Sequence, residues 1–75
     1  MAKVIVTGWH EGLQKISMTK AIQAHTLLSL SGAKSVTDRV LDGESVKLVV
    51  ESIQEAEVLV NHLKAVGAEA RIASE

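Results

Sequence analysis

The chain has 75 residues, a formal net charge of −1, one aromatic residue and no cysteine. A chain this short buries only about 60–65% of its unfolded surface and cannot supply two cores, so we expect a single domain over residues 1–75. The near-neutral charge and the lone Trp9 argue against nucleic-acid binding, and the lack of cysteine excludes disulfides and thiolate chemistry. Because 47% of the residues are apolar but almost none aromatic, the composition indicates thin helix-on-sheet layers.

Neither a membrane span nor a secretory signal is predicted. No apolar run approaches the roughly 18–20 residues that a membrane helix needs. The first residues, MAKVIVTG, lack the long apolar stretch and the small-residue cleavage site of a signal peptide. A cytoplasmic protein is therefore expected by default.

The first half of the chain predicts one strand and a helix. Residues 3–7 (KVIVT) are β-branched or apolar and precede Gly8, which predicts a buried strand. After a loop over residues 8–14, Ser17 is the expected N-cap of the helix. Its apolar face, at spacings i, i+3, i+4 and i+7, consists of Met18, Ala21, Ile22 and His25, whereas Thr19, Lys20 and Gln23 are expected to face water.

A second helix is predicted to follow directly. Either Ser29 or Ser31 is its expected N-cap, and the pair at residues 42–43 (Asp-Gly) ends it. The helix is expected to continue through the apolar positions Ala33, Val36, Val40 and Leu41. The two helices should therefore form a short hairpin.

The second half predicts strand, helix and strand. Residues 46–50 (VKLVV) alternate as a strand, and residues 69–73 (EARIA) form the last one. Between them, Ser52 and Glu55 have the spacing of a capping box, and Gly67 is placed to close the helix in a left-handed conformation. The buried stripe of this helix is expected to hold Ile53, Ala56, Leu59, Val60, Leu63 and Val66.

The element order is βααβαβ, which predicts an α+β fold. Because the helical hairpin returns the chain to its starting end, the second and third strands both run opposite to the first. A right-handed crossover leaves a gap between them that the first strand fills. The expected architecture is a three-stranded sheet with three helices on one face.

The chain resembles the C-terminal domain of the bacterial large-subunit ribosomal stalk protein, the L-seven/L-twelve family. The likeness is densest over residues 15–36 (KISMTKAIQAHTLLSLSGAKSV), with paired lysines, a Thr-x-Leu-x-Leu step and an Ala-Lys pair. It resumes in the third helix and at residues 65–69 (AVGAE). The resemblance implies a non-catalytic domain that binds translational GTPases or other ribosome-associated proteins.

The resemblance also implies a binding surface on the first two helices. By position it would comprise Lys15, Ile16, Thr19, Lys20 and Lys34, with the lysines meeting acidic groups of the partner. The family usually has a basic residue where this chain has Gln23, and glycines where it has Leu28 and Ser29. The turn between the helices should therefore have another geometry than in the family.

A peptide-recognition adaptor resembling the ClpS family is the alternative, since that family shares the βααβαβ order. Such an adaptor holds a protein N-terminus with acidic and amide groups in the loop before the first helix. Here that loop offers His10, Glu11 and Gln14. We expect neither catalysis nor a cofactor, because no nucleophile, acid and base form a known motif, and the three histidines lack metal-ligand spacing.

Two further features allow more than one interpretation. Trp9, expected in a loop, is either a lid over the sheet edge or an exposed anchor for a partner, and we favour the lid. A monomer is expected, with a dimer through Leu27, Leu28 and Leu30 at the hairpin turn as the alternative.

Overall fold

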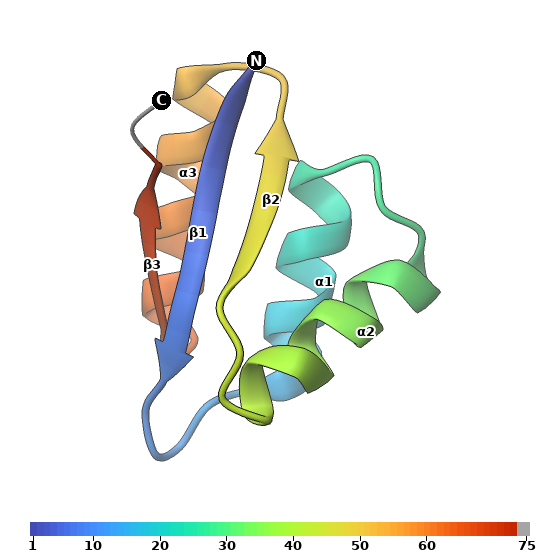
Figure 1. Cartoon of the computed structure of the whole chain (residues 1–75), viewed down its shortest axis with the longest axis vertical. Helices are drawn as coiled ribbons and strands as arrows, with labels where there is room; N and C mark the ends of the chain where they lie inside the picture. Colours follow the sequence, from blue (N-terminus) through green and yellow to red (C-terminus); the bar gives the residue numbers. More distant parts are fainter. Residues whose placement is uncertain (74–75) are drawn as a thin grey trace.

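The computed structural model, which describes residues 1–73, has the predicted order of elements (Figure 1). The first strand is longer than predicted, because Ala2, Gly8 and Trp9 extend it, and the last strand begins and ends one residue earlier. The elements are β1 (Ala2–Trp9), α1 (Lys15–His25), α2 (Leu30–Leu41), β2 (Val46–Val50), α3 (Ile53–Ala65) and β3 (Ala68–Ile72).

The three strands form one sheet in the order β2-β1-β3, with β1 antiparallel to both neighbours. This confirms the predicted topology. The helices cover one face: α3 lies behind β1 and β3, and the α1–α2 hairpin lies on the β2 side (Figure 1). No helix in the described part of the chain is long and apolar enough to cross a membrane.

Alternation along the strands builds the core. Val4 and Val6 of β1 are fully buried, and β2 buries its first, third and fifth residues while the second and fourth are exposed. The largest of the fully buried helix side chains, Met18, Ile22 and Leu59 among them, belong to the same core as these strand residues. Burial of such a side chain contributes roughly 1.5–3 kcal/mol.

The prediction that Ile53 belongs to the buried stripe of α3 is wrong. Its side chain is 54% exposed, whereas Ala56, Leu59 and Leu63 are fully buried. Ile53 is the first residue of the helix, and the stripe that faces the sheet starts one turn later. A spacing pattern does not show where contact with the sheet begins.

The helix caps are partly as predicted. Ser29 caps α2 by accepting a hydrogen bond from the Gly32 N–H, and Ser52 caps α3 by accepting from the Glu55 N–H. Ser17 does not cap α1, because the helix begins at Lys15. Its hydroxyl instead donates to the Gln14 side-chain oxygen at 3.4 Å.

A register shift in β1 changes where Trp9 lies. Val6 pairs with Ala70, but Gly8 pairs with Glu69, so Thr7 is an extra residue in β1. Directly paired residues project on the same face, and Trp9 is paired with Ala68, which is buried under the helices. The shift therefore places Trp9 on the helix side of the sheet, with 44% of its surface exposed.

Gly67 closes α3 with φ of +101°, as predicted. The loop before α1 crosses close to it: the His10 N–H donates to the Gly67 carbonyl and the Gln14 N–H to the Val66 carbonyl. A Cβ at position 67 would lie 3.0 Å from the Leu13 Cα. Glycine is needed at this position for its backbone conformation and for the close approach of the loop.

We expect Gly67→Ala to lower the free energy of unfolding more than Gly43→Ala does. Gly43 has a similar φ of +94°, but nothing lies within 4 Å of the Cβ position. Gly43→Ala should therefore cost only the backbone strain, about 1–2 kcal/mol, and Gly67→Ala about 1–3 kcal/mol more. Urea unfolding of both variants measures the difference, and equal losses would disprove the contact with the loop.

Candidate protein-binding groove

The five residues that the family resemblance implies for partner binding lie together in the structure. Lys15, Ile16, Thr19 and Lys20 of α1 and Lys34 of α2 line one open groove between the two helices. Three further residues of α2 complete its wall, namely Leu30, Thr37 and Asp38. We call this feature the binding groove.

The binding groove has an apolar centre and a mainly basic rim. Ile16 is 73% exposed and Leu30 is 55% exposed, so two large apolar side chains on facing helices stand in water. The three lysines of the groove are also exposed, and Asp38 is the one acidic residue of its lining. Such a surface suits a partner that offers apolar side chains flanked by carboxylates.

Thr19 was expected to face water, and this is wrong. Its side chain is nearly buried and its hydroxyl lies 2.8 Å from that of Thr37, which is fully buried on the facing helix. Each hydroxyl also lies within hydrogen-bond distance of the carbonyl four residues earlier, Lys15 for one and Ala33 for the other. The two hydroxyls thus form a polar link between α1 and α2 beneath the groove.

Three residues of the groove, Leu30, Thr37 and Asp38, were not expected from the sequence to belong to this surface. They lie at i, i+7 and i+8 along α2, with Lys34 at i+4, so they share one helical face. That spacing is visible in the sequence. The turn between the helices decides which face of α2 meets α1, and the sequence does not determine the conformation of this turn.

The turn over residues 26–29 has no residue with positive φ. The Thr26 side chain bonds to the backbone on both sides of it. Its hydroxyl donates to the Ile22 carbonyl at 2.6 Å and accepts from the Leu28 N–H at 3.2 Å. Leu27 remains 88% exposed, and the leucines at 28 and 30 are also exposed. Whether they pair subunits stays a prediction.

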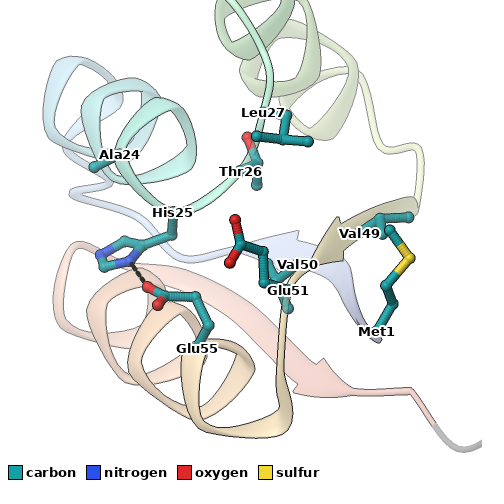
Figure 2. A pocket seen from close by; sticks show the side chains of 9 residues that line it. All are labelled: Met1, Ala24, His25, Thr26, Leu27, Val49, Val50, Glu51 and Glu55. Carbon is teal, nitrogen blue, oxygen red and sulfur yellow. Dashed lines mark hydrogen bonds and ion pairs between the residues drawn. The ribbon is translucent and has the colours of Figure 1, made fainter.

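A second hollow lies between the end of α1, β2 and the start of α3 (Figure 2). In it, His25 Nδ1 lies 2.6 Å from Glu55 Oε1, and the His25 ring meets the His62 ring edge-on at a centroid distance of 5.9 Å. This agrees with the predicted place of His25 on the apolar face of α1, because only 18% of its side chain is exposed. Within residues 1–73, no group of three or more His, Asp or Glu side chains is placed to hold a metal.

The loop residues considered for an adaptor site, His10, Glu11 and Gln14, do not share a contact partner in the hydrogen bonds and ion pairs that the structure describes. His10 Nε2 lies 3.0 Å from Glu69 Oε2, at the end of the sheet. The Gln14 side chain accepts from Ser17 on α1. Glu11 is exposed in the loop between them.

Comparison of the chain with models of protein families, with curated proteins and with solved structures found no match.

Removal of the Thr19–Thr37 link should loosen the hairpin beneath the groove. We expect Thr19→Val and Thr37→Val each to lower the free energy of unfolding by about 1 kcal/mol, because the remaining buried hydroxyl loses one of its two hydrogen-bond partners. The free energy of unfolding of the double variant should fall by less than the sum of the two single losses, and the difference should be about 0.5–1 kcal/mol. A double-mutant cycle from urea unfolding measures this coupling, and strict additivity would show that the hydroxyls are independent.

Proposed function

We propose that this chain is a non-catalytic protein-binding module of the cytoplasm, which captures its partner in the binding groove between α1 and α2. The observation that carries the proposal is that the three lysines and Ile16, which the resemblance to the stalk domain implies for partner binding, line one groove with Leu30. The resemblance to the ribosomal stalk domain makes translational GTPases, or other ribosome-associated proteins, the candidate partners.

The chemistry of the groove sets what the partner must offer. An amphipathic helix with apolar residues at i and i+4 would cover Ile16 and Leu30. Acidic residues beside that apolar stripe would meet the lysine ammonium groups at the rim. Since these lysines are exposed, the attraction mainly raises the association rate and weakens as salt screens it.

The proposal is tested by titrating the chain with a purified translational GTPase. We expect binding that weakens with salt, and NMR shift changes concentrated at Ile16, Leu30 and Lys34. The Lys20→Glu, Lys34→Glu pair should weaken binding roughly tenfold or more, because it places carboxylates opposite acidic groups.

The matched control reverses two lysines outside the groove, Lys47→Glu and Lys64→Glu. It makes the same change in net charge, so it should retain affinity if the groove is the site and lose it if only total charge matters. The melting temperatures of both double variants should stay near that of the native chain, since all four side chains are exposed. Binding that is unchanged in the groove variant would disprove the proposed site.

A further inference from the structure

Within residues 1–73, β3 has a neighbouring strand on one side only. The Ala73 N–H donates to the Lys3 carbonyl, so residues 3 and 73 form a hydrogen-bonded pair. Such pairs alternate along an antiparallel ladder, which makes Ile5–Arg71 the next one. The N–H and C=O groups of Ala70 and Ile72 therefore point away from β1.

At the start of β3, alternate backbone N–H and C=O groups also point away from β1. Beyond the register shift, the His10 N–H donates to the Gly67 carbonyl, so Trp9 and Ala68 form a non-hydrogen-bonded pair. Ala68 thus also directs its backbone groups outward. Three alternate residues of an outermost strand, Ala68, Ala70 and Ile72, offer donors and acceptors to another strand.

The two edges of the sheet differ in access. Beside β2 stand α2 and the turn between α1 and α2, whose residues share a hollow with β2 (Figure 1). In the described part of the chain, no strand or helix lies beyond β3 on the side away from β1 (Figure 1). The open edge is therefore that of β3.

The side chains of β3 alternate in a way that suits self-pairing. Ala68 and Ala70 are buried toward the helices, whereas Glu69 and Arg71 are exposed on the opposite face. These two charges are opposite and stand symmetrically about Ala70. An antiparallel copy of the same strand, centred on Ala70, would present Arg71 to Glu69 and Glu69 to Arg71.

The charges also select one register. The outward backbone groups allow Ala70 to face Ala68, Ala70 or Ile72 of a second copy. Facing Ala68 would place Glu69 directly opposite Glu69, and facing Ile72 would place Arg71 opposite Arg71. Like charges directly opposite destabilise a strand pair, so only the register with Ala70 opposite Ala70 is favoured.

We propose that the β3 edge is a self-association surface, on which a second copy of this chain pairs antiparallel about Ala70 to extend the sheet from three strands to six. Three hydrogen-bonded residue pairs and two Glu69–Arg71 pairs hold the copies together. Glu69 already contacts His10 through one carboxylate oxygen, and a carboxylate has acceptor sites for a second donor. The binding groove lies on α1 and α2, so both surfaces can be occupied at once.

Sedimentation equilibrium tests the association. A five-residue strand pair is far smaller than an interface of about 1,200–2,000 Å², so the dimer should be concentration-dependent, forming between about 10 µM and about 1 mM. A native chain that stays monomeric over this range overturns the proposal.

Charge reversal tests the register. Glu69→Arg places arginines opposite arginines, Arg71→Glu places glutamates opposite glutamates, and each should weaken the dimer at least about tenfold. The combined Glu69→Arg, Arg71→Glu chain should regain the native affinity. An equimolar mixture of the two single variants should form a heterodimer, because each supplies the charges that the other lacks. Equal affinities in all these samples would overturn the proposed register.

Amide hydrogen exchange tests the strand pairing itself. With rising concentration, protection should increase at the Ala70 and Ile72 N–H groups, which face no strand among the residues that the structure describes. The Arg71 N–H faces β1 and serves as the internal reference. A dimer without added protection at Ala70 and Ile72 would mean that the copies associate elsewhere, for example through the leucines of the hairpin turn, and would overturn the proposal.

Discussion

The structure depends on the burial of one strand between two others. β1 is antiparallel to β2 on one side and to β3 on the other, so it supplies the backbone partners of the whole sheet. Its inward residues, Val4 and Val6, lie at the centre of the core that the three helices cover. With only Val, Ile, Leu, Met and Ala to fill that core, the helices must approach the sheet closely. The positions of α1 and α2, and thus of the binding groove, follow from this packing.

The binding groove has buried, hydrogen-bonded residues at its base and exposed lysines at its rim. The Thr19–Thr37 link and the core residues beneath it hold α1 against α2, whereas the lysine side chains above them are exposed. Under the proposed function, a base that is already ordered lowers the conformational entropy lost on binding. Long exposed cations would also accept partners whose acidic groups differ in position, so the surface would select a pattern of charge and apolar residues more than a single sequence.

Most of the fold could be predicted from the sequence, since strand alternation, the Ser29 and Ser52 caps and Gly67 are local signals. The errors concern residues whose surroundings come from elsewhere in the chain. Thr19 looks like a solvent residue until Thr37 is placed opposite it. Of the two capping-box hydrogen bonds expected at the start of α3, the structure describes only the one from the Glu55 N–H to the Ser52 hydroxyl. The Glu55 carboxylate contacts His25 of α1 instead of the backbone. Propensity identified the elements of the site, but only the packing of α1 against α2 decided which faces meet.

The register shift at Thr7 has a consequence for observing this protein in solution. Trp9 is the only tryptophan, and the chain has no tyrosine or phenylalanine, so its near-ultraviolet absorbance and intrinsic emission come from this one indole. The extra residue turns that indole to the helix side of the sheet, at the end where β1 and β3 begin to separate into the loop. Its emission therefore follows the local fraying of this sheet end. A ligand that fills the binding groove without disturbing the sheet can leave the emission of Trp9 unchanged. A titration without a change in fluorescence would therefore not show that the groove is empty.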